Sequence, residues 1–553
     1  MTTVNGTSSP KRTPATGTAT NDTPANDAPA NGAPGLDADV VVIGAGPVGL
    51  LLADELRLGG ADVLVLERLA EPTTESRAST LHARTMELLD SRDLLTRFGV
   101  LPQDPRGHFG GIPLDLTVPG PYPGQWKAPQ TVTEKLLASL AADLGVRVLR
   151  GHDVHAVEPG ADHVALLART PDGTDTRIRA RYAVACDGQD SALRGLLGAD
   201  FPGRPAEREL LRADVAGLDI PDRRFERLDR GLAIAARRGD GVTRVMVHEF
   251  GTQPSPGRAT DFATVADVWK RVTGEEIGHG TPLWSGSFDD SVRQLTRYRH
   301  GRVLFAGDAA HRQLPVGGQA LNLGLQDAFN LGWKLASAVR AEAAGPGTFA
   351  DTLLNTYHAE RHPAGQQVLT SITAQALLLL GGPEVGPVRA VFEELIALAP
   401  ARRHLAGAVS GLDTRYDLGG GHRLTGALLP HVPLHTSERA GEDTGTGGGA
   451  APSRTVTHSA ALLRDGRGLL LDLTGDDAHG ERLARAVAPW LPRVRHVRAR
   501  TSGPGAVRLD DVGAVLVRPD GHVAWATGPD ATPARALAGA RRALRRWFGP
   551  PTR

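Results

Sequence analysis

The sequence has little cysteine, no net charge and no long apolar run, and each absence excludes a class of protein. A single cysteine, Cys186, stands among 553 residues, so neither an intramolecular disulfide nor a cysteine-rich metal centre can form. Its 62 basic and 62 acidic side chains cancel, which argues against the overall positive field of a nucleic-acid-binding or anionic-membrane-binding protein. The longest apolar run, at 376–380, is far shorter than the roughly 20 residues of a membrane helix. We expect a soluble, cytoplasmic protein of two to four domains, at roughly 150 residues each.

Two stretches of low complexity divide the chain. Residues 1–36 are mostly Thr, Ala, Asn, Pro, Gly and Asp. Such a composition cannot bury enough apolar surface to offset its ordering entropy, which predicts a disordered tail. It also lacks the basic start and apolar segment of a signal peptide. Residues 437–454 have a similar bias and are predicted to form a linker or loop between domains.

A complete strand–turn–helix–strand unit begins where the tail ends. The β-branched run at 40–43 predicts a strand buried on both faces of a parallel sheet. It leads directly into GAGPVG at 44–49, followed by a helical pattern at 50–58. A second apolar strand at 63–66 ends at Glu67. A glycine-rich turn in this setting is the fingerprint of a dinucleotide-binding site.

Each residue of this turn has a physical reason to be there. Gly44 permits the tight turn, Gly46 lets the backbone approach a pyrophosphate, and Gly49 allows close packing of helix and strand. The N-terminal N–H groups and the dipole of the helix that follows attract phosphate. Glu67 is placed to accept hydrogen bonds from the adenosine ribose, and it would repel the 2′-phosphate of NADP. The bound nucleotide is therefore FAD or NAD.

Two further strand endings favour a flavin. The apolar strand at 302–306 is followed by Asp308, whose carboxylate needs a partner such as a ribityl hydroxyl. Glycines at 317–318 let backbone amides approach an aromatic ring, and the dipole of the helix that follows favours a reduced, anionic flavin. A third strand, at 182–186, ends in a turn that begins with Asp187.

These motifs resemble those of the FAD-dependent aromatic hydroxylases, the para-hydroxybenzoate hydroxylase-like group A flavoprotein monooxygenases. Within that family the resemblance is to bacterial members that act on aromatic polyketides such as angucyclines, anthracyclines and tetracycline precursors. It covers about residues 38–550. The matching segments are GAGPVG at 44–49, SRASTLHARTMELLD at 76–90, PQTVTEKLL at 129–137, CDGQDSALR at 186–194, GRVLFAGDAAH at 301–311, LQDAFNLGWKLA at 325–336, YHAERHP at 357–363 and VLVRPDGHVAWA at 515–526.

The resemblance implies an α/β plus α+β protein. We expect a Rossmann-like FAD-binding domain in two segments, 37–200 and 297–410. Between them, alternating polar and apolar stretches in 201–296 predict an antiparallel sheet that covers the substrate. The remainder, 411–553, resembles a thioredoxin-like domain but has no CxxC, which leaves it a packing or dimer-supporting role in a monomer or homodimer.

The resemblance also assigns residues to the cofactor and the substrate. One position departs from the family, because Ala320 stands where a glycine is usual. This difference puts the efficiency or type of chemistry in doubt if the position has a positive φ. Pro315, Gly317 and Gly318 are expected beside the flavin, and His108, Phe109, Trp284 and Phe288 are candidates for the substrate cavity. The expected cofactor contacts are Gly44, Gly46, Pro47, Gly49, Glu67, Arg68, Arg77, Arg84, Gln130, Asp187, Asp308, Pro315, Gly318, Gln319, Ala320, Leu321 and Asn322.

The implied reaction is hydroxylation of a polycyclic aromatic substrate through a C4a-hydroperoxyflavin, with NADPH or NADH and O₂ as co-substrates. No second dinucleotide motif is present, so the nicotinamide is expected to meet a mobile flavin transiently. The cofactor carries the chemistry, and neither a metal nor a catalytic triad is expected. Two alternatives stay open: Baeyer–Villiger oxygen insertion on the same scaffold, and a non-catalytic flavin-binding homologue, for which Ala320 is the motivating feature.

Overall fold

The computed structural model describes residues 35–74, 78–238, 240–254, 260–437, 454–502 and 506–552. The predicted tail at 1–36 lies almost entirely outside these ranges. The stretch at 437–454 also lies outside them, apart from its two end residues. These ends belong to antiparallel partners, β22 (Pro433–Ser437) and β23 (Arg454–His458). The prediction of a linker between domains is therefore wrong, because the stretch connects two strands of one sheet.

The central sheet is built around β1 (Ala38–Ile43), whose six residues are all buried. Its parallel neighbours are β2 (Val63–Glu67) on one side and β11 (Asp175–Ala185) on the other. The parallel strands β8 (Arg147–Arg150) and β20 (Val303–Phe305) extend the sheet beyond these two. The order of these parallel strands is thus β20-β11-β1-β2-β8. One further strand pairs antiparallel with β20, and another pairs antiparallel with β11. The loops after β1, β11 and β20 consequently leave the same edge of the sheet.

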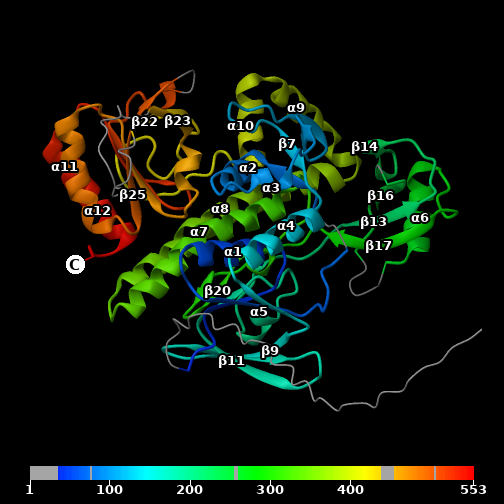
Figure 1. Cartoon of the computed structure of the whole chain (residues 1–553). Coiled ribbons are helices and arrows are strands. Elements are labelled where there is room, and N and C mark those ends of the chain that lie inside the picture. The colour runs from blue at the N-terminus through cyan, green and yellow to red at the C-terminus, as the bar shows by residue number, and fades with distance from the viewer. Residues whose placement is uncertain are drawn as a thin grey trace, which may run out of the picture.

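Helices cover this sheet and carry the chain toward its C-terminus. The helix α1 (Pro47–Leu58) packs on α4 (Gln130–Asp143) and on α7 (Gln319–Ala343), which lies beside the long helix α8 (Phe349–Leu380) (Figure 1). Because α1 lies between other elements, most of its residues are buried. Within the described residues no single helix has the length and hydropathy of a membrane span, and only the bent pair of α8 and 383–397 passes that test jointly.

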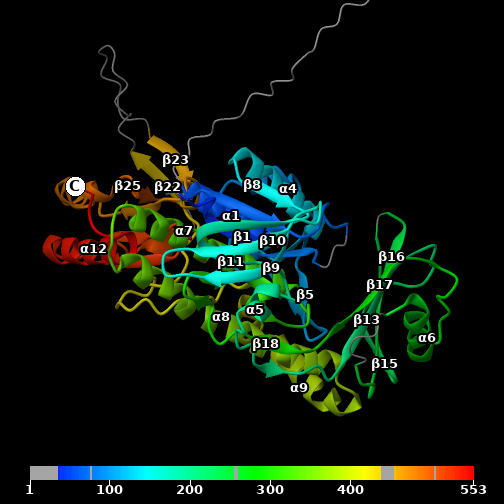
Figure 2. The same cartoon turned by 90° about the horizontal axis from the view of Figure 1, so that it is seen from below.

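A second, five-stranded sheet is entirely antiparallel and has one face covered by α6 (Phe262–Thr273). The two views place it at the opposite end of the molecule from the C-terminal part of the chain (Figure 1 and Figure 2). Its order is β14-β15-β16-β13-β17. The strands are β13 (Glu209–Ala216), β14 (Arg223–Leu228), β15 (Gly231–Arg237), β16 (Val242–Glu249) and β17 (Thr281–Asp289).

The C-terminal part forms a third sheet, of order β23-β22-β25-β24-β26-β27. Within it β24 and β25 are parallel, while β26 is antiparallel to both β24 and β27. The helix between β24 and β25 packs against the C-terminal helix. The elements are β24 (Gly468–Asp472), α11 (Asp477–Val487), β25 (Val494–Thr501), β26 (Ala514–Val517), β27 (Val523–Thr527) and α12 (Pro533–Phe548).

Short elements complete the described fold. The remaining helices are α2 (Ala83–Asp90), α3 (Leu95–Phe98), α5 (Ala192–Leu196), α9 (Gly386–Ala397) and α10 (Ala399–Ser410), with 3-10 turns η1 (Gly307–Ala309), η2 (Pro383–Val385), η3 (Ala460–Leu463), η4 (Ala488–Trp490) and η5 (Ala506–Leu509). The remaining strands are β3 (Thr80–His82), β4 (Gln103–Asp104), β5 (Arg106–Phe109), β6 (Ile112–Asp115), β7 (Gln125–Lys127), β9 (Asp153–Pro159), β10 (Val164–Arg169), β12 (Gly203–Arg204), β18 (Val292–Gln294), β19 (Arg299–His300) and β21 (His311–Arg312).

Buried charges join the C-terminal sheet to the rest of the molecule. The guanidinium of Arg518 bonds both oxygens of Glu360 on α8 at 2.7 and 2.9 Å, and the Lys334 ammonium lies 2.8 Å from the same carboxylate. Arg92 forms a two-pronged pair with Glu55 and also donates to two carbonyls of the C-terminal part. All five side chains are buried, so the two parts of the chain share one interior.

Candidate cofactor and substrate site

The turn after β1 has the shape expected of a phosphate-binding turn. Gly44 has φ +106°, and a Cβ there would lie 2.4 Å from the carbonyl oxygen of Cys186, so only glycine fits. Gly49 packs against the same turn, whereas a Cβ at Gly46 would meet no atom within 4 Å. Pro47 opens α1, and no side chain caps the N-terminus of that helix. Open space beside uncapped N–H groups is the arrangement that a pyrophosphate requires.

Glu67 lies beside this turn at the end of β2. Its two carboxylate oxygens accept hydrogen bonds from the N–H groups of Ala45 and Leu69, both at 2.8 Å. The backbone thus fixes the carboxylate next to the N-terminus of α1, where a ribose bound to the pyrophosphate would lie. Arg68, the next residue, is exposed. The half-buried Gln130 accepts from the Ala78 N–H at 3.3 Å, and Arg77 lies outside the described residues.

Two aspartates follow the neighbouring strands. Asp187 follows β11, and one of its oxygens accepts from the Leu193 N–H at 3.2 Å while the other, Oδ1, is buried with no hydrogen-bond partner among the described residues. Burial raises the pKa of this carboxyl. Asp308 lies in the turn after β20 and is exposed. Arg194 ties the two loops together by donating to the carbonyl of Ala309 at 3.2 Å. An unsatisfied buried oxygen and an exposed carboxylate both suit the hydroxyl groups of a ligand.

The N-terminus of α7 follows a loop with left-handed backbone at two glycines. Gly317 and Gly318 have φ values of +65° and +69°. The Asn322 amide donates to the carbonyls of Thr80 and Gly318 at 2.9 and 2.7 Å, and its oxygen accepts from the His82 N–H at 2.9 Å. The ring of His82 lies 2.8 Å from the Gly317 carbonyl oxygen. Strand β3 therefore fixes the loop that precedes α7.

Ala320 carries no backbone strain. It lies in the first turn of α7, and among the described non-glycine residues only Asp93 and Phe225 have a positive φ. The cost that a left-handed conformation would impose on alanine is absent. The neighbours Gln319 and Leu321 are buried and half-buried, while Pro315 is exposed.

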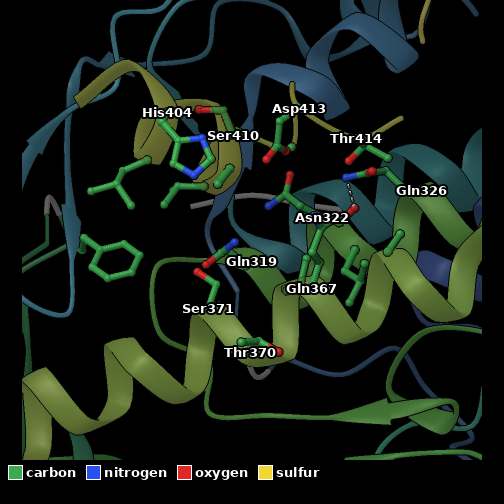
Figure 3. Close-up of a pocket in the computed structure, with 18 of the residues that line it drawn as sticks. Gln319, Asn322, Gln326, Gln367, Thr370, Ser371, His404, Ser410, Asp413 and Thr414 are labelled. Carbon is green, nitrogen blue, oxygen red and sulfur yellow. Dashed lines mark hydrogen bonds between the residues drawn. The ribbon is translucent and has the colours of Figure 1, made fainter. Parts of the chain in front are cut away.

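A cavity of about 300 Å³ lies beside the N-terminus of α7, between α7, α8 and α10 (Figure 3). Three residues of the predicted set line it: Gln319, Asn322 and Phe109. In Figure 3, Gln367, Thr370 and Ser371 extend from the long helix toward the cavity, and His404 and Ser410 face them from the other side. The wall thus combines amides and hydroxyls with apolar side chains. The other lining residues are Leu323, Gln326, Arg361, Ala364, Val368, Ala374, Leu405, Ala408, Val409, Gly411, Asp413 and Thr414.

The other predicted substrate residues lie around the five-stranded sheet. Phe288 packs into an apolar cluster that includes Leu314 and Val316 from the loop before α7. Trp284 covers the guanidinium of Arg212, whose carbon lies 4.7 Å from the ring centre. The centre of the His108 ring lies 3.9 Å from that of Phe225, which packs on the same apolar cluster, with the two rings tilted by 46°. Burial lowers the pKa of His108 to about 3. The structure therefore brings Phe109 to the cavity, and Phe288 to the loop before α7, without gathering all four residues in one pocket.

Arg84 makes structural contacts instead of facing the turn after β1. It is buried, and it donates to the carbonyls of Gly411 and Leu412 at 3.2 and 3.0 Å and to Glu87 at 2.5 Å. His82, two positions earlier, lies inside the 76–90 motif but was not among the residues predicted from the sequence. Among the described residues no group of three His, Cys, Asp or Glu side chains could hold a metal ion.

Comparison with known proteins gives matches over nearly the whole chain. A family model described as FAD binding domain matches residues 37–371, and one described as aromatic-ring hydroxylase, C-terminal, matches residues 422–551. A Streptomyces rimosus protein named 12-dehydrotetracycline 5-monooxygenase/anhydrotetracycline 6-monooxygenase is 40% identical over 538 residues, 93% of this chain and 99% of the relative. A rifampicin monooxygenase of Streptomyces venezuelae is 38% identical over 88% of this chain and 95% of its own length. The crystal structure of an aromatic hydroxylase from angucycline biosynthesis matches with a TM-score of 0.83 and 43% identity, over 93% of this chain and 100% of that one.

Proposed function

This chain belongs to the FAD-dependent aromatic-ring hydroxylases, a family of monooxygenases, and from that premise we propose that it uses NAD(P)H and O₂ to hydroxylate a polycyclic aromatic polyketide intermediate in antibiotic biosynthesis. The observation that carries the proposal is one arrangement: a dinucleotide-type turn after β1 and aspartate loops after the parallel strands β11 and β20 lie at one edge of the central sheet, and an amide-lined cavity lies beside the N-terminus of α7. The relatives named after tetracycline and angucycline chemistry support this class of substrate.

We propose that FAD lies along the edge of the central sheet. The N-terminus of α1 with Gly46 and Pro47 would bind the pyrophosphate, and Glu67 would accept from the ribose. The ribityl chain would meet Asp308 and Asp187. Further contacts are proposed for Gly44, Gly49, Arg68, Arg77, Gln130, Pro315, Gly318, Gln319, Ala320, Leu321 and Asn322. Arg84 is left out, because its guanidinium is already bonded within the fold.

The finer domain description is also a proposal. We assign a Rossmann-like cofactor domain to 37–200 and 297–410, a substrate-binding sheet to 201–296 and a thioredoxin-like domain to 411–553. Support for the last comes from the β24–α11–β25 unit followed by the antiparallel β26–β27 pair and α12, which is a thioredoxin-like order. It has no cysteine, so the role we propose for it is packing.

When bound, FAD supplies the electron transfer from NAD(P)H and the activation of O₂, and the protein supplies binding and orientation. The cavity walls suit a flat molecule with oxygens along its edges. Phe109 offers an aromatic face, and Gln367, Ser371 and His404 offer hydrogen-bonding groups. A volume of about 300 Å³ is at the lower end of small-molecule pockets, which commonly have ~300–1,000 Å³.

Turnover with candidate substrates tests the proposal. Purified, FAD-loaded protein is mixed with NADPH and a panel that includes anhydrotetracycline and angucyclinones, and NADPH absorbance and product mass are followed together. We expect substrate-stimulated NADPH loss and the gain of one oxygen atom as a hydroxyl. A lactone of the same mass, identified by NMR, would show oxygen insertion instead. A protein that binds FAD but oxidises no NADPH with any member of the panel would favour the non-catalytic alternative.

A further inference from the structure

Each of the two glycine carbonyls before α7 is held by a side chain, one from strand β3 and the other from α7 itself. The Gly317 oxygen lies 2.8 Å from Nε2 of His82, and the Gly318 oxygen lies 2.7 Å from the amide nitrogen of Asn322. Asn322 is in turn fixed by the His82 N–H and the Thr80 carbonyl. These residues therefore form one hydrogen-bond network, in which the His82 side chain makes the contact with the Gly317 carbonyl.

The protonation of His82 follows from its surroundings. Its side chain is 1% exposed, and burial lowers its pKa to about 4, so the ring is neutral near pH 7. A carbonyl oxygen only accepts, so Nε2 carries the hydrogen and donates to Gly317. The other ring nitrogen, Nδ1, is buried without a hydrogen-bond partner among the described residues. The ring has thus one hydrogen bond, and it is the bond to the loop.

Holding a carbonyl also directs the N–H group of the same peptide. A trans peptide is planar and its C=O and N–H point in opposite directions. The bond from His82 therefore turns the Gly318 N–H away from the His82 ring, and the bond from Asn322, on α7, turns the Gln319 N–H away from the Asn322 side chain. A larger residue at position 318 would crowd strand β3, because its Cβ would lie 3.1 Å from the Cβ of Thr80. The Gly318 N–H, beside the N-terminus of the helix, is consequently directed by a histidine that bonds to the carbonyl of the same peptide.

We propose that His82 is a positioning residue for the flavin: through the Gly317 carbonyl it aims the Gly318 N–H group at the pyrimidine end of the isoalloxazine, beside the Gln319 N–H group that Asn322 directs. This inference rests on the proposed function. The pyrimidine end gains negative charge when FAD is reduced, and fixed donors stabilise such charge better than mobile ones. His82 thus acts on both FAD affinity and the reduction potential of the bound flavin.

The experiment compares wild type, H82L, H82Q and a matched buried-histidine control, H248L, each loaded with FAD. His248 is 2% exposed and also bonds a backbone carbonyl, that of Glu209 at 2.8 Å, but it lies on β16. FAD dissociation constants and dye-equilibrated reduction potentials are measured. We expect H82L to weaken FAD binding by about tenfold, the equivalent of one well-placed hydrogen bond, and to make the potential more negative. H82Q, which retains an N–H donor, is expected to recover part of both, and H248L to keep the wild-type potential.

The possible outcomes distinguish a failure of the proposed function from a failure of the proposed role of His82. A wild-type protein that binds no FAD would overturn both the proposed function and this inference. If the wild-type protein hydroxylates its substrate but H82L binds FAD with wild-type affinity and has the wild-type reduction potential, only the proposed role of His82 is overturned. Equal changes in FAD affinity and reduction potential in H82L and H248L would show that His82 only packs the interior, and would also reject the proposal. If H82L does not fold, His82→Asn replaces it, because its shorter side chain keeps polarity without reaching Gly317.

Discussion

Gly44 and Gly46 lie two residues apart in one turn, yet a side chain would meet different surroundings at each. At Gly44 a Cβ would strike the carbonyl of Cys186 and the backbone has a positive φ. At Gly46 the space is open and the backbone is extended. The first glycine is therefore required by the fold itself, whereas the second leaves room that only a ligand would use.

Substituting these two glycines should separate folding from binding. We expect Gly46→Val to retain the thermal stability of the cofactor-free protein but to weaken FAD binding by at least about tenfold, because its side chain fills the pyrophosphate space. Gly44→Ala should lower the stability itself, by ~1–2 kcal/mol or more. Thermal unfolding without FAD and titration with FAD measure the two effects, with Gly347→Val, at another open position, as control. A Gly46→Val protein with wild-type FAD affinity would contradict the proposed pyrophosphate site.

Buried histidines make stability depend on pH at the residue scale. Burial lowers the pKa of His82 to about 4, with the charge of Lys127 adding to the effect. Between about pH 6.5 and pH 4 the unfolded chain takes up a proton at this position that the folded chain does not. The free energy of unfolding should therefore fall as pH drops through this window, by at most about 3 kcal/mol from His82. Urea unfolding at several pH values should show a shallower fall in H82Q, and an identical fall in both proteins would refute the assignment.

At the scale of elements, one carboxylate on α7 connects three parts of the fold. Asp327 accepts from the Gly307 N–H at 3.1 Å, from the His311 ring at 2.9 Å and from the Arg361 guanidinium at 2.7 Å. Burial opposes its ionisation, but Arg361 and His311 hold its pKa below the ordinary value. The Asp308 loop is thus anchored by helices α7 and α8 and not by its own sequence.

Removing this carboxylate should destabilise the protein strongly. Asp327→Asn leaves the buried Arg361 without a counter-charge, which typically costs about 3–5 kcal/mol. The matched control is Asp351→Asn on α8, whose exposed pair with Arg299 should contribute less than about 1 kcal/mol. Chemical denaturation of both variants measures the difference. Similar losses in the two would contradict the view that Asp327 anchors the loop.

At the scale of the whole molecule, the C-terminal part is built into the fold. Glu360 lies between Lys334 and Arg518, and these charges hold its pKa at about 2 although burial opposes it. Glu360→Gln should therefore lower the stability of both parts together. We expect calorimetry to show one cooperative transition in the wild type and a lower, still single transition in the variant. A separate transition for the C-terminal part would contradict this coupling.

Local sequence patterns predicted the elements that are built from neighbouring residues. The strand at 40–43, its glycine turn and the strand at 63–66 are confirmed as β1, the turn before α1, and β2, because a βαβ unit has its periodicity and turn residues within one short segment. The role of Arg84 was not predictable, since its partners lie more than 300 positions away at 411–412. The cavity likewise arises only when α7, α8 and α10 pack together, and no local pattern indicates that packing.

The source of the new oxygen atom is the most direct test of the central claim, which is that this chain is an FAD-dependent hydroxylase of a polycyclic aromatic substrate. Turnover with NADPH under ¹⁸O₂, followed by mass spectrometry of the product, measures it. We expect one ¹⁸O atom in each product molecule, carried as a hydroxyl on the ring system. A product without the label would contradict the hydroxylase function, and so would a substrate of unchanged mass after incubation with the FAD-loaded wild-type protein.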